Sequence, residues 1–337
     1  MKYKLIHKNK KKSFLQNKLR IFILFIKYII SSKIIFNKPQ SHEVIIFDCE
    51  SSSHIENVLH KFDYTILSTR AHKIKKVYIT KKIIKFLVVN FFKRSLKQNY
   101  LIKVIEEINP KVVITHIDNS TDFYILAKYF YKRIKFIAVQ RANRETKWLH
   151  PSECKKIFIP EYLCFSSYDK YIYKLKKTNV KIFHTLGSMV ASLAYKYAKD
   201  KKIKINPEQF DICLVGEAQP PRKFGDGSHL DKLPYSVGTL AEYTHRFCKK
   251  HNLKLIFSGA EKKKDKDYEV ARNFYKGYLK NYNFKYAPKK NNYSSYINVM
   301  RSKVVIGATS TLLRESLSFN KKVLCCNFTG HIHDIFE

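Results

Sequence analysis

The segment from Val304 to Asn327, VVIGATSTLLRESLSFNKKVLCCN, constrains the fold of this chain more than any other. An apolar, β-branched run leads into the small residues Gly307 to Thr311, which are followed by a segment of helical character and a second apolar run. This order predicts a strand, a tight turn, a helix and another strand. Two strands joined through a helix form the repeating unit of a parallel sheet.

Similar units recur from Ser41 onward. Apolar segments alternate with helical ones such as NYLIKVIEEINP and TLAEYTHRFCKKH, which predicts parallel sheets covered by helices on both faces. The expected strands lie in HEVIIFD, DYTILS, KKVYIT, KVVITHID, IKFIAVQ, YLCFSSY, VKIFHTL, DICLVG, LKLIFSG and YNFKYAPKKNNYSSYINVMRS. We therefore expect an α/β protein with two Rossmann-like domains that face each other across a cleft. No tandem repeat indicates a solenoid.

A polar, charged segment, YKYAKDKKIKINPEQF, separates the two sets of strands. Such composition is typical of a domain boundary. We expect a basic and apolar segment over residues 1–40, an N-terminal Rossmann-like acceptor domain over 41–200 and a C-terminal Rossmann-like nucleotide-donor domain over 208–337.

The formal net charge is +38, with 65 Lys and Arg against 27 Asp and Glu. Such a surface attracts nucleic acid, acidic lipid and sugar phosphates alike. Only 11 of these cations are Arg, the residue that reads guanine and phosphate in a bidentate manner, and the lysines are spread along the chain. A basic nucleic-acid-binding protein remains an alternative of another class, but we expect no specific nucleic-acid partner.

The first 40 residues join a cationic run, MKYKLIHKNKKKSFLQNKLR, to an apolar one that Lys27 and Lys33 interrupt. A membrane-spanning helix needs about 20 mostly apolar residues, so this segment is too short and too charged. No small-residue cleavage site of a signal peptide follows it. Two interpretations stay open: a segment that lies on an acidic inner leaflet, and a helix that packs on its own domain.

The chain has seven cysteines, an odd number, and they form no CxxC pair and no spacing typical of metal ligands. Several stand inside apolar runs such as DICLVG and VLCCN, where a free thiol behaves as a small core residue. This usage indicates a reducing compartment, so we expect a cytosolic location.

The stretch SYINVMRSKVVIGATSTLLRESLSFNKKVLCCN resembles the C-terminal donor-site region of GT-B glycosyltransferases. VITHIDNSTDFYILAKYF, KFIAVQRANRE and NFTGH resemble a bacterial group of surface carbohydrate biosynthesis transferases and, more distantly, CDP-glycerol glycerophosphotransferases. The resemblance extends from Ser41 to the end of the chain at the level of the fold.

This resemblance implies an enzyme that moves a sugar, or glycerol phosphate, from a nucleotide-activated donor to a glycan or lipid-linked acceptor. The donor is a substrate, and no cofactor or metal is implied. The expected place is the inner face of the cell membrane, as a peripheral protein. GT-B enzymes usually continue with further helices where this chain ends, at NFTGHIHDIFE. We therefore expect a short C-terminal domain, and whether it supports catalysis is left open by the sequence. A UDP-sugar epimerase on the same fold is the alternative enzyme.

The turn in the opening segment has the chemistry of a diphosphate site. Gly307 and Ala308 leave room beside the unpaired amides at a helix start, and the next three residues add hydroxyl groups, namely Thr309, Ser310 and Thr311. Glu315, one turn beyond Thr311, lies on the same face, and the resemblance implies that it binds the ribose. The alternative is an ordinary N-cap at Ser310 and a solvated Glu315. Arg314 points to another face, where we expect it to be exposed.

Further candidates follow other expected strands. For nucleotide binding they are Arg222 in EAQPPRK and Ser258, Gly259 and Lys262 in SGAEKKK; in the first domain they are Asp48, His116, Asp118, Asp122, Arg141 and Arg144. An inverting transferase needs a base for the acceptor hydroxyl, for which we select His116 or Asp118. Each can equally be a residue that stabilises its own loop. DNSTD carries two carboxylates without a partner cluster, so we assign no metal.

We predict that the first 40 residues attach the chain to anionic membranes. Lysines beside an apolar run gain both electrostatic and hydrophobic contact with such a surface. The full chain should co-sediment with acidic vesicles but not with neutral ones, and a chain that starts at Ser41 should be soluble and folded. Equal sedimentation with both vesicle types would remove the electrostatic part of this prediction.

Overall fold

A computed structural model describes residues 32–70, 74, 76–144, 149–217, 229–279, 286–326 and 328 of the chain. Most of the expected N-terminal segment, up to residue 31, therefore lies outside the described residues. Within the described ranges, no helix has the length and apolar character needed to cross a membrane. The chain divides into two compact units, which are residues 1–140, 154–163 and 177–184, and residues 141–153, 164–176 and 185–337.

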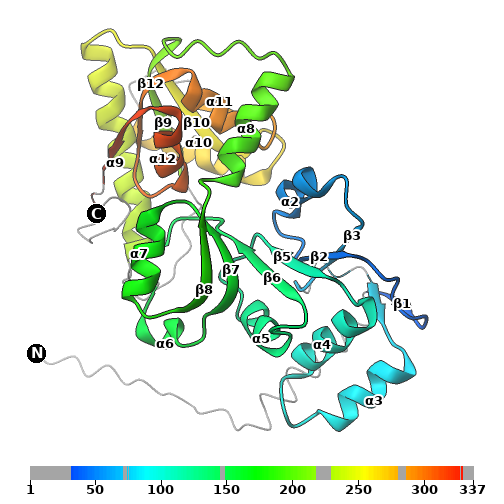
Figure 1. Cartoon of the computed structure of the whole chain (residues 1–337). Coiled ribbons are helices and arrows are strands. Elements are labelled where there is room, and N and C mark those ends of the chain that lie inside the picture. The colour runs from blue at the N-terminus through cyan, green and yellow to red at the C-terminus, as the bar shows by residue number, and fades with distance from the viewer. Residues whose placement is uncertain are drawn as a thin grey trace, which may run out of the picture. The chain divides into compact units, whose positions relative to one another are not determined.

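The first sheet has six strands in the order β3-β2-β5-β6-β7-β8 (Figure 1). The pairs from β3 to β7 are parallel. The strands are β2 (Val44–Phe47), β3 (Tyr64–Leu67), β5 (Val112–Thr115), β6 (Lys135–Val139), β7 (Phe158–Cys164) and β8 (Asn179–Thr185). A separate parallel pair joins β1 (Lys33–Ile35) to β4 (Lys76–Tyr78).

Helices connect the strands of this sheet, as parallel pairing requires. They are α2 (Ser52–Leu59), α3 (Lys81–Val89), α4 (Leu96–Ile108) and α5 (Thr121–Tyr129). Helix α4 begins with a capping box, in which Ser95 and Gln98 each bond the other's main-chain amide. All four residues of β2 are buried, which explains its uninterrupted apolar sequence. The ring of Phe47 packs 5.8 Å from that of Phe123 on α5.

The second sheet has five strands in the order β11-β10-β9-β12-β13, and all of its neighbouring pairs are parallel. The strands are β9 (Phe210–Val215), β10 (Leu255–Lys262), β11 (Tyr286–Lys289), β12 (Ser302–Gly307) and β13 (Lys322–Cys325). The helices of this unit are α6 (Pro151–Cys154), α7 (Ser167–Leu175), α8 (Met189–Asp200), α9 (His229–Lys250), α10 (Lys266–Tyr278), α11 (Ser294–Met300), α12 (Thr311–Ser316) and the 3-10 turn η2 (Leu317–Phe319).

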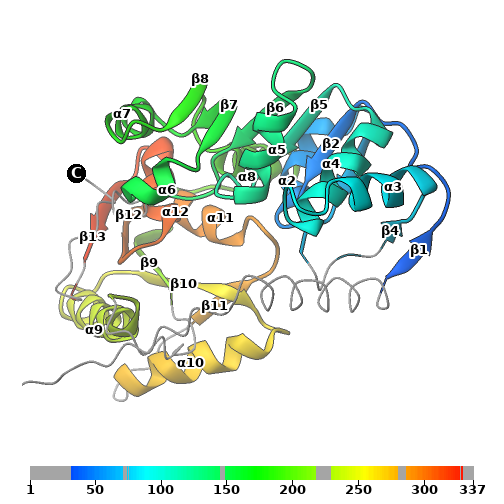
Figure 2. The same ribbon diagram turned by 90° about the horizontal axis from the view of Figure 1, so that it is seen from below.

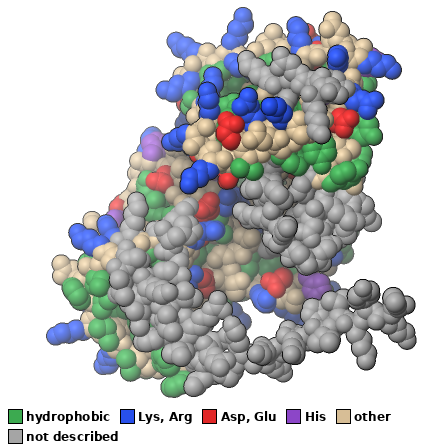
Figure 3. Space-filling model, turned by 180° about the vertical axis from the view of Figure 1, so that it is seen from behind, with side chains coloured by type: hydrophobic (Ala, Val, Ile, Leu, Met, Phe, Trp, Pro, Cys, Tyr) green, Lys and Arg blue, Asp and Glu red, His purple; other side chains and the backbone are tan. Residues whose placement is uncertain are grey.

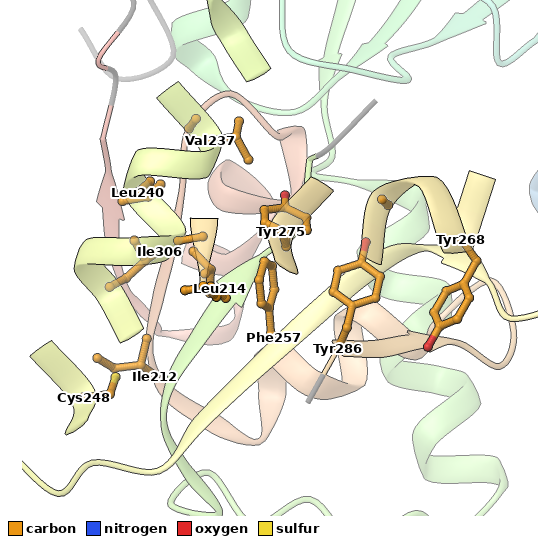
Figure 4. Close-up of a cluster of buried hydrophobic side chains, with 14 residues drawn as sticks. Ile212, Leu214, Val237, Leu240, Cys248, Phe257, Tyr268, Tyr275, Tyr286 and Ile306 are labelled. Atoms are coloured by element: carbon orange, nitrogen blue, oxygen red, sulfur yellow. The ribbon is translucent and has the colours of Figure 1, made fainter. Parts of the chain in front are cut away.

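Two apolar clusters cover the two faces of the second sheet. Alternate residues of a strand point to opposite faces, so Ile212 and Leu214 join helices α9 and α10, whereas Cys213 and Val215 join α11 and α12. Figure 2 shows α9 and α10 together on one side of the sheet. Figure 4 shows Phe257 between Leu214 and Tyr286 in the first cluster.

The compact units differ from the boundary that we predicted between residues 200 and 208. Helix α8 belongs with the second unit because it packs on α11: Ala198 lies in one buried cluster with Ile297 and Met300. Residues 141–153 and 164–176 also belong to that unit. The charged composition after Tyr195 covers the end of helix α8 and the residues that follow it.

Most expected strands are present, with one difference. Of the predicted strand-like segment YNFKYAPKKNNYSSYINVMRS, Tyr286–Lys289 forms a strand and Ser294–Met300 a helix. The seven cysteines are free, and burial raises the pKa of the Cys213 thiol to about 12. On the face in Figure 3, the described Lys and Arg side chains are scattered rather than gathered into one patch.

We predict that Phe257→Ala lowers the free energy of unfolding by about 3 to 5 kcal/mol, because it leaves a cavity under the second sheet. Phe257 is 2% exposed and contacts the rings of Tyr275 and Tyr286. Phe247→Ala is the matched control, since Phe247 is 52% exposed on α9. Urea unfolding of both variants measures the difference, and equal losses would contradict the assigned core.

Candidate functional site

The turn between β12 and α12 lies where the strand pairing of the second sheet ends. Gly307 is the last residue of β12 and pairs with Cys325 of β13. The main-chain amides of Ala308 and Thr309 follow beyond the ladder. On the other side of β12, Ile306 pairs with Leu214 of β9, and this register brings Glu217 alongside Thr309.

The carboxylate of Glu217 accepts hydrogen bonds from this turn. Ala308 N donates to Oε1 at 2.9 Å, and Thr309 N lies 3.0 Å from Oε1 and 2.9 Å from Oε2. The Thr309 hydroxyl donates to Oε2 at 2.6 Å. The turn thus binds a carboxylate of its own chain in the manner expected for an anion.

Close side-chain contacts surround the small residue at position 307. A Cβ atom on Gly307 would lie 2.9 Å from Leu313 Cδ2 and 3.0 Å from Glu217 Oε1. Any side chain here therefore disturbs either the packing of α12 or the bound carboxylate. The neighbouring thiol of Cys325 has its pKa raised to about 11, first by burial and then by the charge of Glu217.

Helix α12 begins where the sequence predicts. Ser310 is the N-cap residue, and its hydroxyl accepts from Leu312 N at 3.3 Å. The hydroxyl of Thr311 accepts from Asn143 N at 3.2 Å. The N-cap assignment is confirmed, and Thr311 links the helix to residues 141–144.

Glu315 is buried, with 6% of its surface exposed, so the alternative of a solvated carboxylate is wrong. Its Oε1 accepts from the Ser188 hydroxyl and its Oε2 from the Tyr296 hydroxyl at 2.7 Å. Burial raises the pKa of Glu315 to about 7, while these two hydrogen bonds lower it. Ribose binding by this residue stays a prediction.

Arg314 is not exposed, contrary to expectation: its side chain is 13% exposed and pairs with Asp169, which is 3% exposed. The two guanidinium nitrogens meet the two carboxylate oxygens at 3.0 and 3.1 Å. Ser166 and Asn143 accept further hydrogen bonds, and the guanidinium lies over the Tyr168 ring. The reason is a partner 145 residues away in sequence, which periodicity does not reveal.

The candidates on β10 have structural contacts. Ser258 is 2% exposed and its hydroxyl accepts from Asn298 at 3.0 Å. A Cβ on Gly259 would meet the Tyr286 ring at 2.6 Å, so packing alone requires glycine here. Lys262 N donates to Asp265 at 3.0 Å. Arg222 lies outside the described residues, and the nucleotide-binding roles stay predictions.

The two predicted bases lie directly after β5. Asp118 is fully buried, and its carboxylate accepts from the Tyr162 hydroxyl at 2.8 Å. His116 is 3% exposed, with its ring edge-on to that of His54 at 5.6 Å. The Asp118 contact is the one that a loop-stabilising residue would make. A catalytic role for either residue stays a prediction.

The remaining first-domain candidates are dispersed. The carboxylate of Asp48 accepts hydrogen bonds from the side chains of Thr69 and Arg70, and the backbone of Asp48 has a φ of 74°. Asp122 lies in the first turn of α5 and pairs with Lys97 at 2.7 Å. Arg141 and Arg144 belong to the second unit. Within the described residues, no group of His, Cys, Asp or Glu is arranged to hold a metal ion.

Sequence reasoning missed four residues of this site: Glu217, Asp169, Ser188 and Tyr296. Glu217 carried a partial signal, since it directly follows an expected apolar strand, but the place of that strand beside the turn comes from the assembled sheet. The other three carried none, because they come from separate segments of the chain.

Comparison with known proteins agrees with this architecture. Residues 222–337 match the model of a family described as a putative O-antigen biosynthesis protein. No curated protein matches the chain. A putative UDP-N-acetylglucosamine 2-epimerase from Listeria monocytogenes has a similar structure, with a TM-score of 0.50 and 12% identity over 87% of this chain and 79% of that one.

Two further solved structures are similar at lower scores. The UDP-GlcNAc 2-epimerase from Neisseria meningitidis is 13% identical over 84% of this chain and 81% of that one, with a TM-score of 0.49. A glycosyltransferase from Rickettsia africae is 12% identical over 87% of this chain and 79% of that one, with a TM-score of 0.41.

The chain has the GT-B type of fold. The expected resemblance to GT-B proteins of surface carbohydrate biosynthesis is thereby confirmed, with the family match confined to residues 222–337. The more distant resemblance to CDP-glycerol glycerophosphotransferases is not confirmed.

We predict that the buried Glu315 makes stability depend on pH. Its pKa in the folded chain, about 7, exceeds the ordinary glutamate value of 4.5, so the folded state binds the proton more tightly. The contribution of the protonated Glu315 to the free energy of unfolding is complete below pH 4.5 and is lost as the pH rises to 7. The free energy of unfolding should fall by about 3 kcal/mol over this range, since each pKa unit corresponds to about 1.36 kcal/mol. Urea unfolding at a series of pH values should show this fall in the wild type.

Glu315→Gln is the control, because it keeps the shape and removes the titration. Its unfolding free energy should lack this fall between pH 4.5 and 7. A wild type and variant with parallel pH profiles would show that Glu315 titrates near its ordinary pKa.

Proposed function

We propose that the chain transfers a sugar, or glycerol phosphate, from a nucleotide-activated donor to an acceptor hydroxyl in cell-surface polysaccharide biosynthesis. The observation that carries this proposal is the β12–α12 turn, where two amides and one hydroxyl converge on an anion at the carboxyl edge of a parallel sheet. Ligands of open α/β sheets bind at this edge. The family match over residues 222–337 supports the polysaccharide context.

In this proposal the turn stabilises the leaving group. In sugar transfer, the acceptor oxygen attacks the anomeric carbon, the bond from that carbon to the donor's phosphate oxygen breaks, and the nucleoside diphosphate leaves with the bonding electrons. In glycerol-phosphate transfer, the acceptor oxygen attacks the phosphorus of the transferred group, the bond from that phosphorus to the bridging oxygen breaks, and the nucleoside monophosphate leaves with the bonding electrons. The amides of Ala308 and Thr309 and the Thr309 hydroxyl would hydrogen-bond the phosphate oxygens as their charge grows. The proton of the acceptor passes to a base, for which His116 and Asp118 remain our predictions.

Glu315 is proposed to bind the donor's ribose. Each of its oxygens accepts one hydrogen bond in the present structure, and a carboxylate has about four acceptor sites. The ribose hydroxyls would donate to the remaining ones.

We also propose that the protein works at the cytoplasmic face of the membrane. Two features support this: the basic and apolar composition of the first 40 residues, and seven free cysteines, which are typical of a reducing compartment.

A UDP-sugar epimerase is the second candidate, because the similar Listeria structure is described as a putative UDP-N-acetylglucosamine 2-epimerase. The two candidates differ in their need for an acceptor. An epimerase would change the configuration of UDP-N-acetylglucosamine at carbon 2 without any acceptor, whereas a transferase would leave the sugar unchanged until an acceptor is supplied.

Thermal unfolding of the full chain against a panel of nucleoside diphosphates tests the donor site. A ligand that binds only the folded state raises the melting temperature. We predict that one nucleotide raises the melting temperature of the wild type. Its affinity should fall roughly tenfold to hundredfold in Glu315→Gln, because the variant loses the hydrogen bonds between the ribose and a charged carboxylate.

Inorganic pyrophosphate is the matched ligand, because it lacks the ribose. Its affinity should be the same in the wild type and in Glu315→Gln. If no nucleotide binds the folded chain, the proposed function is wrong; undiminished nucleotide binding to the variant would reject the role of Glu315 alone.

A further inference from the structure

We propose that Glu217 is an internal occupant of the anion position in the β12–α12 turn, and that the donor's diphosphate must displace its carboxylate in order to bind. This inference rests on the proposed function, since it concerns the same turn. It assigns to Glu217 a role in setting donor affinity, which the sequence did not suggest.

The first argument is that the carboxylate binds the three donors of Ala308 and Thr309. Ala308 N, Thr309 N and the Thr309 hydroxyl all bond its two oxygens, at 2.6 to 3.0 Å. These groups precede the N-cap residue Ser310, so the contact belongs to the turn itself and not to helix α12. A phosphate oxygen needs the same donors, and two anions repel each other at such a distance.

The second argument is that the turn cannot hold both groups. Ala308 is 1% exposed, and even a Cβ atom on Gly307 would come within 3.0 Å of Glu217 Oε1. The space above Gly307 is therefore already filled by the carboxylate. A diphosphate that reaches the amides must take the place of this group.

The third argument concerns how Glu217 is held. Its main-chain amide donates to the Tyr275 hydroxyl at 3.0 Å, which fixes the backbone after β9. Glu217 as a whole is only partly buried, and its carboxylate is held by hydrogen bonds and not by an ion pair within the described residues. Displacement thus requires a change of side-chain conformation and leaves the sheet in place.

The affinity for an anion follows from this competition. When a binding-competent state is populated only in part, the apparent affinity falls by that fraction. A carboxylate that occupies the turn for 90 to 99% of the time would weaken anion binding about tenfold to hundredfold. Removing the charge of Glu217 should therefore strengthen anion binding by the same roughly tenfold to hundredfold.

Three variants separate occupancy from charge. Glu217→Gln keeps the shape and removes the charge, and Glu217→Asp keeps the charge but shortens the reach. Glu261→Gln is the matched control: Glu261 lies on the adjacent strand β10, and its carboxylate accepts from the Tyr286 hydroxyl instead of the turn. Far-ultraviolet circular dichroism checks folding, and Glu217→Asp carries the test if Glu217→Gln does not fold.

Calorimetric titration of the full chain with inorganic pyrophosphate measures the effect. We expect both Glu217→Gln and Glu217→Asp to bind roughly tenfold or more tightly than the wild type, and Glu261→Gln to stay within about twofold. Pyrophosphate binding that is unchanged or weaker in the Glu217 variants would overturn the inference and make Glu217 a structural support of the turn. Equal tightening in Glu261→Gln would also overturn it, because the effect would then be one of net charge.

The outcome is separable from that of the proposed function. If a nucleoside diphosphate stabilises the wild type but the Glu217 variants bind pyrophosphate no better, only this inference fails. If neither the wild type nor the variants bind any of these ligands, the inference and the proposed function fail together.

Discussion

The organisation of the second unit depends on one constraint, which is that the amides of Ala308 and Thr309 need acceptors where the β12 ladder ends. A buried main-chain N–H without a partner costs about 1 to 3 kcal/mol. The neighbouring strand β9 supplies the acceptor through Glu217, two residues beyond its last strand residue. The same contact that completes the sheet edge therefore places a negative charge where the turn can hold an anion.

Helix α12 builds on this turn and joins three other segments to it. Arg314 binds Asp169 at the start of α7 and Asn143 in the preceding segment. Glu315 binds Ser188, the N-cap of α8, and Tyr296 of α11. These buried polar contacts explain why residues 141–153 and 164–176 belong to the second unit although they interrupt the first sheet in sequence.

The sequence predicted what local pattern determines. The strands of both sheets, the turn at Gly307 and the N-cap at Ser310 follow from apolar runs, small residues and capping chemistry within a few positions. The environments of Arg314 and Glu315 did not follow, because Asp169 lies 145 residues from Arg314 and Ser188 lies 127 residues from Glu315. The position of Glu217 required the register of β9 against β12, which depends on the assembled sheet. Arg222 and most of the N-terminal segment lie outside the described residues.

Helix α12 has only six residues, and two adjacent ones bind different segments of the chain. Successive residues of a helix point about 100° apart, so a single inserted residue would turn both side chains away from their partners at once. A longer helix would absorb such a change over several turns, but this one begins at Thr311 and passes into a 3-10 turn at Leu317. The spacing between the turn and these two side chains is therefore fixed by two sets of contacts at once, and we expect an insertion or deletion within the helix to disturb this region more than most single substitutions around it.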